Sequence, residues 1–171
     1  MPLKILIGPS SFAATDRTPM NRMIAAGYEV IDNPYKRKLT KEELLGLLAS
    51  EVIGLVAGLE PIDREVMRYS HLRVISRVGS GLSNVDLTAA RELGIEVCST
   101  PHGPTAAVAE LTLGALLALL RMIPLMDQAL HQGQWIKKIG VQLEGKTVAI
   151  VCFHQESADI GRSFSEIGRR P

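Results

Sequence analysis

Short apolar runs alternate with longer amphipathic segments along the first hundred residues of the chain, and glycine or proline stands at most of the junctions. The apolar runs are rich in β-branched residues, which is typical of strands, and the segments between them carry helix signals. We expect strands over 3–7, 28–31, 53–57, 72–77 and 95–98, and helices over 19–26, after Thr40, after Asp63 and over 85–93. Strands that alternate with helices in this way predict an α/β fold, a flavodoxin-like parallel sheet with helices on both faces.

Three of these helices begin with recognisable caps. Thr40 is followed three residues later by Glu43, which predicts a capping box, and Asp63 is expected to cap the next helix. Ser83 or Asn84 is the expected cap of the helix over 85–93. These signals fix where the helices start and therefore where the loops lie.

A loop rich in proline and glycine follows the fifth strand and leads into a long apolar helix over 106–121. Thr105 is the expected cap of this helix, and Glu110 is expected to be buried in its first turns, where the helix dipole favours a carboxylate. The apolar run 111–120 is too short to span a bilayer.

The turn after the strand at 72–77 is the first candidate site. Gly79 and Gly81 flank Ser80, so the backbone can adopt positive φ and direct several N–H groups towards one anion. Arg77 stands just before the turn and can supply a cation to the same anion. A plain tight turn remains the alternative.

Two further residues have two interpretations each. Glu60 follows the strand over 53–57, where open α/β sheets place ligands, so it is either a cleft carboxylate or a solvated loop residue. Trp135 stands in a polar loop and is either an interface anchor or a core residue.

Composition and charge limit the kinds of partner that the chain is expected to bind. The chain has 171 residues, 46% of them hydrophobic, with 19 basic and 18 acidic side chains that nearly cancel. Bulk charge therefore gives no reason to expect nucleic acid or a membrane surface as partner. The two cysteines, Cys98 and Cys152, stand in apolar contexts and predict buried thiols in a reducing cytoplasm. The first apolar run is too short for a signal peptide, so we expect a cytoplasmic protein.

The histidines and cysteines show no metal-binding or catalytic pattern. The two cysteines and four histidines never form a C-x-x-C or H-x-x-x-H pair, so no metal site is predicted. His102 lies closest to the candidate site, but no spacing singles it out as a general base. No residue of the chain is predicted to be catalytic.

Four segments occur in an order that resembles a known family: RVGSGLSNVD, STP, PTAAVAELTLGALLALLR and LEGKTVAIV. Together they are similar to the D-isomer-specific 2-hydroxyacid dehydrogenases, and within them to the phosphoglycerate dehydrogenase branch. The resemblance implies a substrate-binding domain over 1–100, an inter-domain helix and dimerisation arm over 101–144, and the truncated start of an NAD-binding Rossmann domain over 145–171.

The resemblance also implies roles for particular residues. Arg77, Ser80 and Gly81 would hold the acidic end of a 2-hydroxy acid, and Thr100 would contact the NAD cofactor. The long helix and the arm after it would form a homodimer. The family's catalytic arginine, acidic residue and histidine lie further along than this chain extends.

The sequence departs from the family where the phosphates of NAD should bind. A G-x-G-x-x-G motif is expected after the strand at 148–151, yet Cys152 and His154 stand where the first two glycines belong. Gly161 matches the end of the motif, displaced by four residues, and is the remaining candidate for cofactor binding.

Three hypotheses of function follow. The first is an NAD-dependent oxidoreductase that acts on the CH–OH group of a 2-hydroxy acid. The second is an inactive remnant of the substrate domain that binds an acid or only dimerises. The third is a free-standing flavodoxin-like binding or response module that ends near Cys98, which leaves the long apolar helix unexplained.

Overall fold

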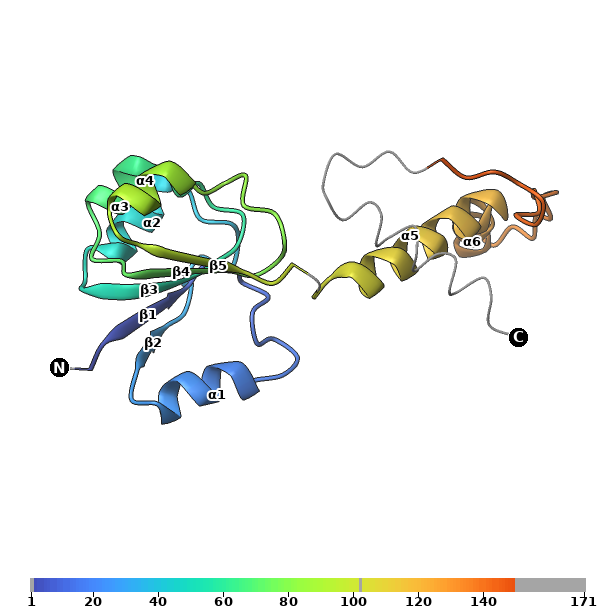
Figure 1. Cartoon of the computed structure of the whole chain (residues 1–171). Helices are drawn as coiled ribbons and strands as arrows, with labels where there is room; N and C mark the ends of the chain where they lie inside the picture. Colours follow the sequence, from blue (N-terminus) through green and yellow to red (C-terminus); the bar gives the residue numbers. More distant parts are fainter. Residues whose placement is uncertain (1, 102, 150–171) are drawn as a thin grey trace. The chain divides into compact units, whose positions relative to one another are not determined.

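The computed structural model describes residues 2–101 and 103–149, which divide into two compact units at the Gly103–Pro104 bond (Figure 1). The first unit alternates strands and helices, as the sequence predicts. Its elements are β1 (Lys4–Ile7), α1 (Thr18–Ala25), β2 (Glu29–Ile31), α2 (Lys41–Leu48), β3 (Val52–Ala57), α3 (Arg64–Arg68), β4 (Val74–Arg77), α4 (Leu87–Glu92) and β5 (Glu96–Ser99). The second unit contains α5 (Thr105–Leu120) and α6 (Ile123–His131).

The five strands form one parallel sheet in the order β2-β1-β3-β4-β5. This order is that of the flavodoxin-like doubly wound folds, so the predicted fold class is confirmed. The chain moves outward in opposite directions from β1 and β3, and the loops that follow these two strands therefore separate at the carboxyl edge of the sheet. A crevice at this switch point is where such folds bind ligands.

Helices cover both faces of the sheet, but unequally (Figure 1). The face under α2, α3 and α4 carries the main core, in which Leu6, Leu55 and Ile75 from three adjacent strands are at most 1% exposed. The α1 face has a smaller core around Ile7 and Met20. Most of the apolar burial that stabilises this unit therefore lies on one side of the sheet.

The predicted caps are correct for two helices and wrong for a third. The Thr40 hydroxyl accepts the Glu43 N–H while the Glu43 carboxylate accepts the Thr40 N–H, which confirms the capping box. Asp63 caps α3 through the Val66 N–H. The cap of α4, however, is Asp86, whose carboxylate accepts the Ala89 N–H at 2.9 Å.

The expected cap at Ser83 or Asn84 is wrong because a tertiary contact takes the Asn84 side chain. Its Nδ2 donates to the carbonyls of Gly58 and Glu60 in the loop after β3. That contact leaves Asp86, the next short polar side chain, to begin α4. Helix α4 consequently starts later than the sequence predicts.

The second unit differs from its prediction in its first turn. Pro104 occupies the N-cap of α5 and Thr105 is already helical, with a buried hydroxyl that has no partner among the described residues. Thr105 is therefore not the cap. Glu110 is exposed rather than buried. Ala109 is the buried residue of α5, and large apolar side chains around it are open to solvent, among them Leu111 at 73% exposure.

Helices α5 and α6 meet at a bend of 67°, where Met122 adopts a left-handed conformation with φ 53°. Within the described residues, neither helix by itself has the length and apolar character needed to cross a bilayer; only the bent pair taken together meets that standard of length and composition. Pro124 lies in the first turn of α6, as suits a residue without an N–H.

Two expectations near the strands need correction. Cys98 is exposed, not buried, because β5 is the edge strand of the sheet and has a neighbouring strand on one side only. Val148 and Ala149 are not in a strand, and the rest of the strand expected over 148–151 lies outside the described residues. Cys152, His154 and Gly161 lie outside them too.

Candidate functional site

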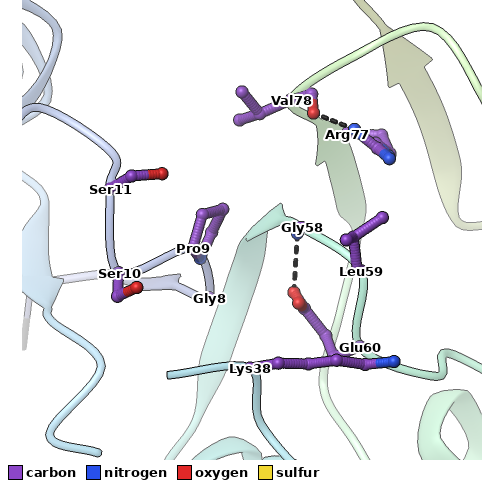
Figure 2. Close-up of a pocket in the computed structure, with 10 residues that line it drawn as sticks. All are labelled: Gly8, Pro9, Ser10, Ser11, Lys38, Gly58, Leu59, Glu60, Arg77 and Val78. Carbon is purple, nitrogen blue, oxygen red and sulfur yellow. Dashed lines mark hydrogen bonds between the residues drawn. The ribbon is translucent and has the colours of Figure 1, made fainter. Parts of the chain in front are cut away.

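A pocket of about 350 Å³ opens at the carboxyl edge of the sheet (Figure 2). Its wall comes from the loops that follow β1 and β3 and from the end of β4, and Lys38 reaches it from the segment before α2. The lining residues are Gly8, Pro9, Ser10, Ser11, Lys38, Gly58, Leu59, Glu60, Arg77 and Val78. The pocket thus occupies the switch point of the sheet.

The glycine turn after β4 is held by the loop that follows β5. Gly79 has φ 125°, a conformation that favours glycine, and its N–H donates to the Thr100 hydroxyl at 2.8 Å. The Thr100 N–H in turn donates to the Gly79 carbonyl at 3.0 Å. The Gly79 N–H is therefore already used, and only the later part of the turn fits the predicted anion site.

Ser80 and Gly81 supply that later part. Within the described residues their N–H groups have no hydrogen-bond acceptor, and both residues are half-buried. Buried backbone donors in proteins are nearly always paired, so free donors at a loop are open to water or to a ligand. Two adjacent free donors at this edge of the sheet suit a carboxylate.

Arg77 lies at the end of β4, where its side chain borders the pocket (Figure 2). One guanidinium nitrogen donates to the Val78 carbonyl, and its Nε is buried without an acceptor among the described residues. A guanidinium has five N–H donors, so this contact leaves most of them for an anion. No carboxylate lies within ion-pair distance of Arg77 in the described part of the chain.

Glu60 is buried, with 1% of its surface exposed, so its interpretation as a solvated loop carboxylate is wrong. Its Oε1 accepts the Gly58 N–H at 2.8 Å (Figure 2), and Gly8 packs so closely that a Cβ there would collide with the carboxylate. The packing of Gly8 against Glu60 cannot be found from the sequence, because it depends on how near the loops after β1 and β3 lie to each other. Glu60 fixes the shape of the pocket wall.

Asn33 is a second buried polar residue, and it was not identified from the sequence. It is fully buried, and its side-chain amide donates to the carbonyls of Gly8 and Arg37 at 2.6 and 2.7 Å. The Asn33-Pro34 pair, typical of a turn, was the available sequence signal. Asn33 holds the loop after β1, as Glu60 holds the loop after β3.

A second pocket, of about 470 Å³, lies on the α1 face of the sheet. Its wall is mostly apolar, with Phe12, Met23 and Val74 among the lining residues, and Arg77 and Thr100 border it as well. Arg77 therefore lines both the pocket at the switch point and the more apolar pocket beside α1.

The structure brings together four of the five predicted site residues. Arg77, Ser80, Gly81 and Thr100 lie in or beside one turn, whereas Gly161 lies outside the described residues. Trp135 is 84% exposed, which contradicts its interpretation as a core residue. No group of three or more metal-ligating side chains is found within residues 2–101 and 103–149.

The strand order and this turn define a doubly wound α/β domain with a glycine turn at its carboxyl edge. Sequence comparison matches residues 13–165 to the family described as D-isomer specific 2-hydroxyacid dehydrogenase, catalytic domain. The chain belongs to this family.

Individual relatives agree with the family match. The chain is 32% identical to human D-3-phosphoglycerate dehydrogenase over 147 residues, which is 84% of this chain and 27% of the human enzyme. It is 39% identical to the D-3-phosphoglycerate dehydrogenase of Methanocaldococcus jannaschii over 116 residues, 66% of this chain and 22% of that enzyme.

Solved structures share the fold. A protein from Thermus thermophilus is 30% identical, with a TM-score of 0.78, over 96% of this chain and 52% of that one. The NAD+-bound 3-phosphoglycerate dehydrogenase of Entamoeba histolytica is 25% identical, with a TM-score of 0.61, over 71% and 40%. The chain thus spans about a quarter of the length of these curated relatives and about half of these solved structures.

Proposed function

We propose that this chain supplies the acid-binding part of an NAD-dependent D-2-hydroxyacid dehydrogenase of the phosphoglycerate dehydrogenase type. The observation that carries the proposal is the turn after β4, which begins directly after Arg77. In the described part of the chain the N–H groups of Ser80 and Gly81 have no acceptor, and the Arg77 guanidinium has no carboxylate partner. Such a group of donors binds the carboxylate of a 2-hydroxy acid and fixes the position of its C2 carbon.

NAD, when bound, supplies the hydride chemistry. Of the two residues expected to contact it, Thr100 is described and Gly161 is not. The Thr100 hydroxyl accepts the Gly79 N–H and keeps its own proton for donation, so it fits a contact to a cofactor amide or hydroxyl oxygen. The role of this chain is to hold the acid on the carboxyl side of the sheet.

We propose a homodimer that forms through the second unit. Support comes from the apolar side chains that α5, α6 and the segment after them expose, including Leu111 at 73% and Trp135 at 84%. Large apolar side chains exposed in this number favour an interaction site. The exposed free thiol of Cys98 supports a location in a reducing compartment, the cytoplasm.

Calorimetry on the purified chain tests the proposal, with D-3-phosphoglycerate and NADH titrated separately. We expect saturable binding of the acid, and Arg77→Ala should weaken it at least tenfold because a cation bound to a carboxylate is removed. The matched control is Arg73→Ala, which removes an exposed arginine just before the start of β4. Equal affinity in the wild type and Arg77→Ala would exclude Arg77 from the site.

A second candidate function is a remnant that binds an acid or dimerises without turnover. It is favoured by Cys152 and His154, which stand where the family has glycines, and by Glu156 and Asp159, whose charges oppose a pyrophosphate. Acid binding without NADH binding would support this second candidate over the dehydrogenase.

A further inference from the structure

The turn after β4 and the loop after β5 are joined by two hydrogen bonds that run in opposite directions. The Gly79 N–H donates to the Thr100 Oγ1 at 2.8 Å, and the Thr100 N–H donates to the Gly79 carbonyl at 3.0 Å. The second bond is available to any residue except proline. The first depends on a side-chain hydroxyl at position 100.

This pair of bonds holds the glycine that directly precedes Ser80 and Gly81. Gly79 is held at φ 125°, and the N–H groups of Ser80 and Gly81 come directly after it. A glycine in this region of φ has several other accessible conformations, so something outside the turn must select one of them. The Thr100 hydroxyl is the side-chain group that bonds to the Gly79 N–H.

Thr100 also lies at the end of the first unit. The Gly103 N–H donates to the Thr100 carbonyl at 3.3 Å, and the next residue, Pro104, begins the second unit. The same residue thus contacts the acid-binding turn through its side chain and the last turn of the unit through its backbone.

We propose that Thr100 is a positioning residue for acid binding: its hydroxyl holds Gly79 so that the N–H groups of Ser80 and Gly81 converge on the substrate carboxylate. This inference rests on the proposed function, because it concerns the same turn. It assigns Thr100 a role in the binding of the acid that is separate from the cofactor contact expected from the family.

The test compares two substitutions at this exposed position in the full chain. Thr100→Val keeps the shape and the β-branch but removes the hydroxyl, whereas Thr100→Ser keeps the hydroxyl and removes a methyl group. We expect Thr100→Val to bind D-3-phosphoglycerate about tenfold more weakly, equivalent to about 1.4 kcal/mol, and Thr100→Ser to bind it within about twofold of the wild type.

Amide hydrogen exchange, read by NMR at single residues, separates positioning from general stability. The Gly79 amide should exchange faster in Thr100→Val than in Thr100→Ser, because it has lost its acceptor. The Ala89 amide, which is bonded to Asp86 in α4, should be unchanged in both variants. The urea midpoint of unfolding should also stay the same.

Two results overturn the inference. Wild-type affinity in Thr100→Val would show that the hydroxyl does not position the turn, and equal weakening in both variants would show that the loss of binding does not follow the hydroxyl, which Thr100→Ser keeps. Failure of the wild-type chain to bind the acid is a different outcome, since it contradicts the proposed function and removes the binding that Thr100 would support.

Discussion

The two units of the chain use their apolar residues in opposite ways. In the first unit the large aliphatic side chains of β1, β3 and β4 face helices and are almost completely buried, as Leu6, Leu55 and Ile75 show. In the second unit the helix α5 is apolar on nearly all sides, yet Ala109 is its buried residue and Leu111 and Leu119 are more than 70% exposed.

This difference shows that the first unit has a core of its own, whereas the described part of the second unit leaves large apolar side chains exposed. A helix that is apolar all round is normally enclosed by other elements. Matched pairs of substitutions can test this contrast between buried and exposed apolar residues. Further substitutions and a change of pH can test the contacts that hold the first unit together.

The largest effect is expected from a matched pair of leucine substitutions. Leu55→Ala removes a side chain that is 1% exposed in the centre of the sheet and should lower the free energy of unfolding by about 2 to 5 kcal/mol. Leu111→Ala, at 73% exposure, should change it by less than about 0.5 kcal/mol when the protein is too dilute for the proposed dimer to form. Urea denaturation followed by circular dichroism gives both values, and similar losses would remove the contrast between the units.

The next effect concerns the buried carboxylate at the pocket. Glu60→Ala leaves the Gly58 N–H without its acceptor and should lower the free energy of unfolding by about 1 to 3 kcal/mol, measured by urea denaturation. Glu60→Gln keeps an oxygen in that place, so its loss of stability should be smaller than that of Glu60→Ala. Equal destabilisation by both substitutions would show that the hydrogen bond from the Gly58 N–H is not the interaction by which Glu60 stabilises the fold.

Two threonines at helix starts give a smaller effect. Thr40→Ala removes a cap that accepts the Glu43 N–H and should lower the free energy of unfolding by about 1 kcal/mol. Thr105→Ala should change it by less than about 0.5 kcal/mol, because the Thr105 hydroxyl has no partner among the described residues. Urea denaturation measures both, and the order would be reversed if Thr105 were the cap of α5.

The smallest effect is a dependence on pH. Hydrogen bonds from Lys41 and the Val66 N–H hold the pKa of Asp63 below its ordinary value of 3.8. A carboxyl whose pKa is lowered by folding stabilises the fold above its ordinary pKa, and this contribution is lost as the pH falls through the folded value. The free energy of unfolding, measured in urea at a series of pH values, should therefore fall as the pH is lowered from about 5 to below the ordinary pKa of aspartate.

Asp63→Asn provides the control for this measurement. Asparagine still caps the helix, so α3 is retained, while the titrating carboxyl is absent. The slope of stability against pH should be shallower in Asp63→Asn than in the wild type. An identical slope would assign the acid sensitivity to other carboxyls, such as Glu43, whose pKa is lowered by Arg37.

Local signals predicted most of the first unit. The alternation of strands and helices, the capping box at Thr40 and the cap at Asp63 all involve residues within four positions of each other, so the sequence contains the information. The predicted cap of α4 was wrong because Asn84 bonds instead to the loop after β3, more than twenty residues earlier.

Part of the site could be predicted and part could not. The Gly79 turn and Arg77 were predicted because a strand followed by two glycines is visible in the sequence. The burial of Glu60 and Asn33 depends on the strand order, which brings the loops after β1 and β3 together around Gly8. The exposure of Cys98 follows from the same order, which leaves β5 at the edge.

The most direct test of acid binding at the turn after β4 is an NMR titration of the 15N-labelled chain with D-3-phosphoglycerate. We predict that the amide signals of Ser80 and Gly81 shift most and saturate together with the calorimetric binding curve, while the Ala89 amide in α4 stays in place. Saturable binding with the largest shifts away from this turn, or no binding at all, would contradict the assignment of the acid site.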